Sequence, residues 1–212
     1  MARRILQWLV IAALVICYPF LAHYTNASAH SSNLGALVAV APLTFISLVL
    51  AWRSPYRIVM LGMLVLACVA LWIVWPALQT HYGLVYWLQH VGMQLILLMT
   101  FGRTLIAGRQ PLCTRFAEAV HPPLTLQHAI YARRVTIAWT LFFATMALIS
   151  SFLFFLAPLT VWSVFANFLT LPLVASMFIA EYWVRRWMFT DMQRAHILDA
   201  VRAFHASAAR PR

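Results

Sequence analysis

The side chains in this chain that are best suited to bind another molecule are arginines between residues 103 and 134. A planar guanidinium group grips a phosphate or carboxylate through two parallel hydrogen bonds. Gly102 and Gly108 flank the first of these arginines, and glycine lets the backbone approach a ligand closely. The residues expected to bind an anionic partner are Arg103, Thr104, Arg109, Arg115, Arg133 and Arg134. The sequence therefore predicts a site for a lipid headgroup, a phosphopantetheine arm or an acidic carrier protein.

The same arginines have a simpler explanation, as orienting charges of a membrane protein that also hold lipid phosphates. All fifteen basic residues of the chain are arginine, and lysine is absent. Lysine would orient a membrane protein equally well, which favours specific binding, but a GC-rich genome would give the same bias. The sequence leaves both explanations open.

A second polar group lies inside an apolar stretch of the chain. His90 and Gln94 are one helical turn apart and share a face, with Tyr86 one turn earlier. Such a polar face turns toward protein or water instead of lipid. One interpretation is hydrogen bonding between helices, with Asn167 as an expected partner. The other is a cavity for the head of a lipid-like substrate, with His90 as the proton carrier.

His121 and His128 are the other candidates for proton transfer, and with His90 they form the set of possible catalytic residues. Both lie near arginines that could bind the phosphate of a thioester substrate, so they could serve an acyltransferase as general bases. The simpler interpretation is that both side chains are exposed to water.

The three cysteines do not indicate a disulfide or a metal site. Cys17 and Cys68 lie in apolar stretches and are expected to be small core residues, and Cys113 lies on the reducing side of the membrane. No C-x-x-C pair and no histidine-rich spacing suggests a bound metal. We therefore expect no cofactor.

The four acidic residues each have an arginine three or four positions away, a spacing that brings partners onto one helix face. The expected pairs are Glu118 with Arg115, Glu181 with Arg185, Asp191 with Arg194, and Asp199 with Arg202. No acid is left over in the apolar stretches, where proton-coupled transporters usually need one. This pattern argues against a secondary transporter.

Six apolar stretches must position these residues, and each is near the length that a helix needs to cross roughly 30 Å of hydrocarbon. The predicted spans are residues 5–22, 34–51, 58–78, 84–102, 135–157 and 161–183. A chain with 64% hydrophobic and 9% charged residues cannot form the surface of a soluble globule. The predicted fold is all-α, a polytopic membrane protein with one transmembrane domain, 1–188. A cytoplasmic loop, 103–134, lies within it, and a tail with an amphipathic helix, 189–212, follows.

The arginines also predict the orientation of the chain. All of them lie at one end of the predicted spans, whereas the segments 22–33, 79–83 and 157–160 at the other end carry no charged residue. By the positive-inside rule, both termini and the long loop are cytoplasmic. The first stretch also has the outline of a secretory signal peptide with a cleavage site at Ala27–Ala29, but its apolar run is longer than usual, which favours a retained helix.

Three motifs carry a resemblance to a known family. They are F-G-R-T-L-x-x-G-R-x-P-L-x-T-R-F-A from Phe101, Y-A-R-R-V-T-I-A-W-T-L-F-F from Tyr131 and W-S-V-F-A-N-F from Trp162, in about the C-terminal half. The chain here resembles a bacterial inner-membrane family found among genes for aryl polyene (xanthomonadin-type) pigments. The resemblance implies a role beside acidic acyl carrier proteins and a lipid product. Some members are labelled ketosynthase, but that activity needs a soluble thiolase-type fold with an activated cysteine and two histidines, which does not fit Cys113 in this chain.

Together these features predict an accessory protein of the bacterial inner membrane that assists synthesis or export of an aryl polyene-type lipid. It would dock an anionic carrier or intermediate at its cytoplasmic arginines. We expect membrane lipids and an acidic acyl carrier protein as partners, and no nucleic acid. Two other functions stay open, a small membrane-bound acyltransferase and a lipid or metabolite exporter. For the acyltransferase, His196 and Asp199 have the wrong spacing for the usual H-x-x-x-x-D motif.

Overall fold

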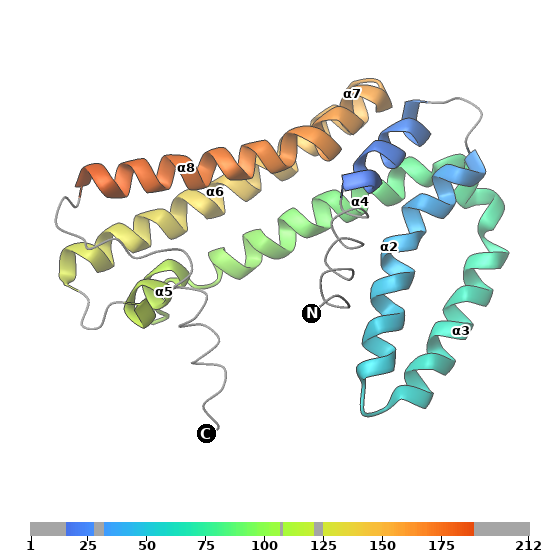
Figure 1. The fold of residues 1–212 in the computed structure, drawn as a ribbon, viewed down its shortest axis with the longest axis horizontal. Helices are drawn as coiled ribbons and strands as arrows, with labels where there is room; N and C mark the ends of the chain where they lie inside the picture. Colours follow the sequence, from blue (N-terminus) through green and yellow to red (C-terminus); the bar gives the residue numbers. More distant parts are fainter. Residues whose placement is uncertain (1–15, 28–31, 107, 121–124, 189–212) are drawn as a thin grey trace, which may run out of the picture. The chain divides into compact units, whose positions relative to one another are not determined.

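The described part of the chain is helical. A computed structural model describes residues 16–27, 32–106, 108–120 and 125–188, and these ranges contain no strand (Figure 1). Four helical stretches in them are long and apolar enough to cross a membrane: Asn33–Arg53, Trp75–Gly102, Leu126–Leu156 and Leu159–Met188. The chain therefore has the helices of an all-α membrane protein. The predicted amphipathic helix in the tail, 189–212, lies outside the described residues.

The order of the helices sets where the polar residues lie. A helical segment at residues 16–27 comes first. The elements after it are α2 (Ser32–Arg53), α3 (Arg57–Ile73), α4 (Trp75–Gly102), α5 (Leu112–Val120), α6 (Leu126–Leu156), α7 (Leu159–Val164), the π-helix η1 (Phe165–Leu169) and α8 (Thr170–Met188). The predicted loop 103–134 thus contains a short helix and the first turns of α6.

The predicted third span, 58–78, is divided between two helices. α3 ends at Ile73, and α4 begins at Trp75. Pro76 lies in the first turn of α4, where proline is tolerated because its missing N–H would have no helical partner. Hydropathy alone does not show this boundary, because the residues on both sides of it are apolar.

The predicted connection 79–83 is helical, with a break at His81, where φ is −124° and ψ is 21°. The hydroxyl of Thr80 donates to the backbone carbonyl of Ala77 at 2.8 Å, and the His81 ring nitrogen Nδ1 lies 3.1 Å from the same oxygen. Side chains that bond to nearby backbone compete with the helical hydrogen bonds, which explains the break at this point.

The chain divides into two compact units. The first unit comprises Met1–His90 and Ser150–Thr170, and the second comprises Val91–Ile149 and Leu171–Arg212. The buried core of the first unit is formed by Ala22, Ala39, Tyr86 and Trp162. In the second unit, the buried ring of Trp139 contacts the rings of Phe101, Phe142, Phe143 and Phe178.

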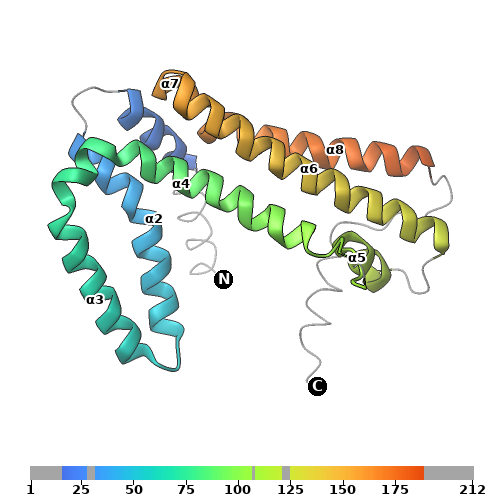
Figure 2. The same ribbon diagram turned by 180° about the vertical axis from the view of Figure 1, so that it is seen from behind.

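Each unit turns large apolar side chains outward, as expected for a lipid-facing surface. Figures 1 and 2 show α2 and α3 as a hairpin in the first unit. They also show the parts of α6 and α8 in the second unit side by side, where Trp139 contacts Phe178. Neither α3 nor α8 contains a buried residue. Cys17 and Cys68 are exposed on such surfaces, so the prediction that they are core residues is wrong. The reason is that a lipid-facing surface is as apolar as a core, and hydropathy does not separate the two.

Candidate functional site

His90 of α4 joins three helical elements of the first unit. Its Nδ1 lies 2.9 Å from the hydroxyl of Ser150 on α6, and its Nε2 lies 2.9 Å from the hydroxyl of Thr170 at the start of α8. Ser150 also accepts a hydrogen bond from the indole N–H of Trp162 at 3.0 Å. The hydroxyl of Thr170 donates to the backbone carbonyl of Phe165 at 3.1 Å. These five residues form one continuous chain of hydrogen bonds.

The two ends of this hydrogen-bond chain determine which group donates in each of its hydrogen bonds. An indole N–H can only donate, and a carbonyl can only accept. Since Thr170 gives its proton to Phe165, it accepts from the Nε2–H of His90. Ser150 accepts from Trp162 and donates to Nδ1 of the ring. The neutral imidazole is thereby satisfied at both nitrogens, and a second proton on Nδ1 would break its bond with Ser150.

The π-helix η1 contributes to this chain. Within it, the backbone N–H of Thr170 bonds to the carbonyl of Phe165, five residues earlier, and the hydroxyl of Thr170 bonds to the same oxygen. A carbonyl has two lone pairs and can accept both bonds. Single π-turns inside helices frequently occur at functional sites. Here Thr170, which accepts a hydrogen bond from His90, closes this wider turn.

A second buried cluster in the first unit surrounds Ser163. Its hydroxyl oxygen accepts from the side-chain amides of Asn26 at 3.3 Å and Asn167 at 3.1 Å, which occupy both lone pairs. The serine proton is therefore directed at Nδ1 of His23, 3.1 Å away. A serine with both lone pairs occupied is not available as a nucleophile. Asn167, the expected partner of His90, belongs to this cluster instead.

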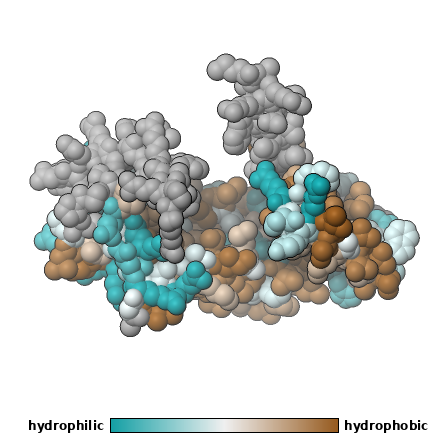
Figure 3. Space-filling model, turned by 90° about the horizontal axis from the view of Figure 1, so that it is seen from below, coloured by the Kyte–Doolittle hydropathy of each residue, from teal (hydrophilic) through white to brown (hydrophobic). Residues whose placement is uncertain are grey.

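Five of the residues predicted to bind an anion are exposed in the second unit. We call Arg103, Arg109, Arg115, Arg133 and Arg134 the arginine face. In the part of the chain that the structure describes, none of them forms an ion pair with an acid. Figure 3 shows hydrophilic residues gathered over the end of this unit that holds α5, beside an apolar surface. Their guanidinium groups are available for a partner.

Two buried threonines fix the backbone beneath the arginine face. Thr104 accepts from the backbone N–H of Leu112 at 3.0 Å, and Thr136 of α6 accepts from that of Cys113 at 3.2 Å. These bonds cap the first two N–H groups of α5. Gly108 closes the loop in the left-handed region, with φ +83°. Thr104, predicted to bind an anion, thus also holds the backbone that carries the neighbouring arginines.

The remaining candidates for nucleophilic or acid–base chemistry do not converge. Burial raises the pKa of the half-buried Cys113 thiol, which stays protonated at neutral pH, whereas the thiolate is the nucleophilic form. Nδ1 of His128 lies 2.6 Å from the hydroxyl of Thr125. His121 lies outside the described residues.

One of the four predicted ion pairs between an acidic residue and an arginine is present in the described residues. The pair Glu181–Arg185 is confirmed, with Oε1 3.7 Å from Nε. The pair expected between Glu118 and Arg115 is not formed, and Glu118 accepts a hydrogen bond from the side-chain amide of Gln110 at 2.5 Å. The other two predicted pairs lie beyond the described residues.

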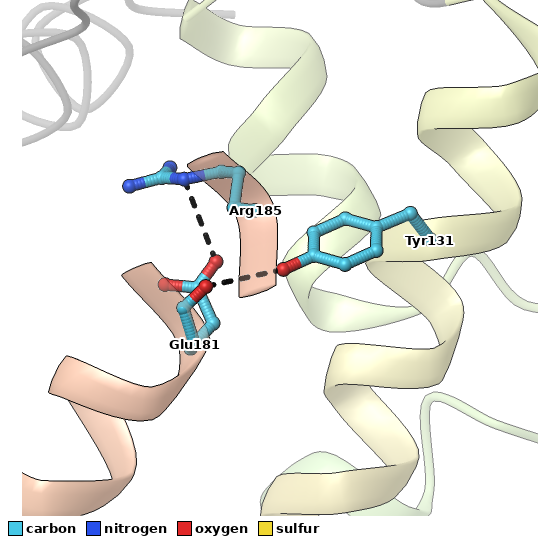
Figure 4. A network of polar contacts seen from close by, with 3 residues as sticks. All are labelled: Tyr131, Glu181 and Arg185. Carbon is cyan, nitrogen blue, oxygen red and sulfur yellow. Dashed lines mark hydrogen bonds and ion pairs between the residues drawn. The ribbon is translucent and has the colours of Figure 1, made fainter. Parts of the chain in front are cut away.

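Sequence reasoning missed one contact at the confirmed pair. The hydroxyl of Tyr131 on α6 donates to the backbone carbonyl of Glu181 on α8 at 3.3 Å (Figure 4). This contact joins the two helices within the second unit and places Arg185 beside the helix that carries Arg133 and Arg134. A tyrosine two positions before two arginines was the available signal, but spacing does not show which helix its hydroxyl meets.

Comparisons of the chain with protein-family models, with curated proteins and with solved structures give no match. The contacts and charges of the chain itself show a neutral hydrogen-bond network around His90 in the first unit and the exposed arginine face in the second.

Proposed function

We propose that this chain is an accessory protein of the bacterial inner membrane that assists synthesis or export of an aryl polyene-type lipid. It docks an anionic carrier or intermediate at the arginine face. One observation carries the docking role: five exposed arginines without an acidic partner in the described residues stand near a backbone that Thr104 and Thr136 hold in place. Unpaired guanidinium forks favour phosphate and carboxylate groups. The link to a pigment lipid rests on the three motifs that resemble the pigment-associated family.

The proposed membrane arrangement has six spans, with the arginine face and both termini in the cytoplasm. Four helical stretches of sufficient length support it, together with α3, whose 17 residues extend about 26 Å at the usual rise per residue. The described helical segment 16–27 contains the end of the proposed first span, 5–22, and continues into the predicted connection after it. The orientation follows from the arginines by the positive-inside rule.

The described side chains support binding more than catalysis. His90 is satisfied at both nitrogens, and Ser163 has both lone pairs occupied. The thiol of Cys113 stays protonated. An acyltransferase would have to use His128 or His121 as its base, and it would show turnover. A docking protein would bind its partner without turnover.

The test is a titration of the purified full chain, in phosphatidylcholine nanodiscs, with an acidic acyl carrier protein that bears an acyl thioester. A lipid acceptor is included so that acyl transfer can be detected. We expect saturable, stoichiometric binding that weakens as salt is added, because screening acts strongly on exposed charges. Nanodiscs without the protein are the control. Absence of binding contradicts the docking function, and acyl transfer supports the acyltransferase in its place.

A further inference from the structure

Arg185 is the one arginine in the described ranges that an acid holds in place. Its Nε lies 3.7 Å from Oε1 of Glu181, and the two side chains are 35% and 18% exposed. Tyr131 of α6 binds the backbone carbonyl of the same Glu181, so this turn of α8 is tied to a second helix. Glu181 therefore orients the guanidinium group of Arg185 through an ion pair, whereas the arginines of the arginine face have no acid to orient them in the described residues.

The binding edge of this guanidinium group is still open. The ion pair uses Nε, and Figure 4 shows the two terminal nitrogens of Arg185 directed away from Glu181 and Tyr131. Those two nitrogens form the fork that binds an oxyanion through parallel hydrogen bonds. A fork that is already oriented loses less conformational entropy on binding than one on a free side chain. Glu181 thus orients Arg185 at Nε, while its two terminal nitrogens stay open to a ligand.

We propose that Arg185 binds a phosphodiester group of the docked partner, and that Glu181 is the residue that positions it. This inference rests on the proposed docking function and names the group that is recognised. A phosphodiester is what a phospholipid headgroup and the phosphopantetheine arm of a carrier protein have in common. Its two free oxygens match the spacing of the guanidinium fork.

The effect of Glu181→Gln on anion affinity shows whether this carboxylate positions Arg185 or only repels anions. If this carboxylate only repels anions, Glu181→Gln strengthens anion binding, because a negative charge is removed. If it positions Arg185, the same substitution weakens binding, because the fork loses its orientation. Arg186 is the matched control for Arg185, since it follows directly on α8, is exposed, and donates from Nη1 to the hydroxyl of Tyr182 at 3.4 Å.

The experiment is native mass spectrometry of the full chain in detergent with two probes. The first is dioctanoylphosphatidylglycerol, and the second is glycerophosphoglycerol, the same diester without acyl chains. We expect Arg185→Lys to weaken binding about tenfold, the scale of one charge-assisted hydrogen bond, and Arg186→Lys to change it less than about twofold. Glu181→Gln weakens binding as well. Melting temperatures confirm that each variant is folded.

The two probes separate the sources of the phosphodiester. Binding of the lipid alone assigns the site to a headgroup with its acyl chains, and binding of both probes assigns it to the diester itself, as on a carrier arm. If Arg185→Lys binds like the parent chain, or if Glu181→Gln binds more tightly, the role given to these two residues is overturned. If the parent chain binds neither probe and no carrier protein, the docking function itself fails.

Discussion

Two polar regions of this protein, the His90 network in the first unit and the arginine face in the second, differ in how their polar groups are satisfied. In the first unit, hydrogen bonds run from Trp162 through His90 to the carbonyl of Phe165, and none of the groups in this hydrogen-bond network carries a formal charge. In the second unit, the arginine face carries full charges that have no acidic partner in the described residues. A polar group inside the hydrocarbon must form its hydrogen bonds within the protein, whereas water can solvate an exposed cation until a partner binds. The first arrangement stabilises helix packing, and the second retains binding capacity.

The largest expected effect concerns the side of the membrane that each region faces. In a chain whose three cysteines are replaced by alanine, Thr80→Cys should react fully with an impermeant maleimide in intact cells. Gln127→Cys should react only after lysis. Both positions are exposed, so burial does not limit either reaction. Labelling at Gln127 in intact cells would contradict the six-span orientation.

Close packing in the first unit predicts the next largest effect. A Cβ atom at Gly35 would lie 2.8 Å from the ring of Tyr82, whose hydroxyl is held by the backbone carbonyl of Thr25 at 3.0 Å. Gly35→Ala should therefore destabilise the protein by about 1–3 kcal/mol, as overpacking does. The control is Gly62→Ala on α3, where a Cβ would meet nothing within 4 Å. Thermal unfolding in detergent measures both, and equal melting temperatures would contradict the packing described here.

A smaller effect is expected from His90→Gln. Glutamine can keep one hydrogen bond of the imidazole but cannot span the distance between Ser150 and Thr170 in the same way, so stability should fall by roughly 0.6 kcal/mol, an average interhelical bond. Partner binding should not change, and neither should its dependence on pH, because the neutral ring keeps its single Nε2 proton and gains no second one in this account. His128→Gln, at a half-buried histidine of the second unit, is the control for stability. Lost function at unchanged stability would make His90 a chemical participant.

The smallest effect is expected at Gln94. Its side-chain oxygen is buried without a hydrogen-bond partner among the described residues. Gln94→Met keeps the shape and removes an unsatisfied acceptor, a change that is often close to neutral. We expect the melting temperature to stay the same or rise slightly. A loss above about 1 kcal/mol would show that this oxygen binds a group such as an ordered water or ligand.

The long helices and the exposed position of the arginines could be predicted from sequence, because the length of an apolar stretch and the position of a charge are read directly from it. The boundary between α3 and α4 could not, since Trp75 continues the apolar run. Neither could the outward position of Cys68, because lipid-facing and core residues have the same polarity.

The hydrogen-bond partners were also beyond sequence reasoning. Single hydroxyls such as Ser150 and Thr170 are common in membrane helices and show no periodicity, so only their spatial arrangement shows that they meet His90. The spacing of Glu181 and Arg185 did predict an ion pair, because that contact lies within one helix. The contact with Tyr131 joins two helices, and no local pattern encodes it.

The central claim is that guanidinium groups of the arginine face bind an anionic partner, and one measurement tests it most directly. Arg103, Arg109 and Arg115 are replaced together by lysine, and the affinity of the purified chain for an acidic acyl carrier protein is compared with that of the parent. Lysine keeps the charge and the membrane orientation but loses the planar fork. We predict that affinity falls at least about tenfold, at an unchanged melting temperature. Equal affinities would contradict the claim and leave these arginines with an orienting role alone.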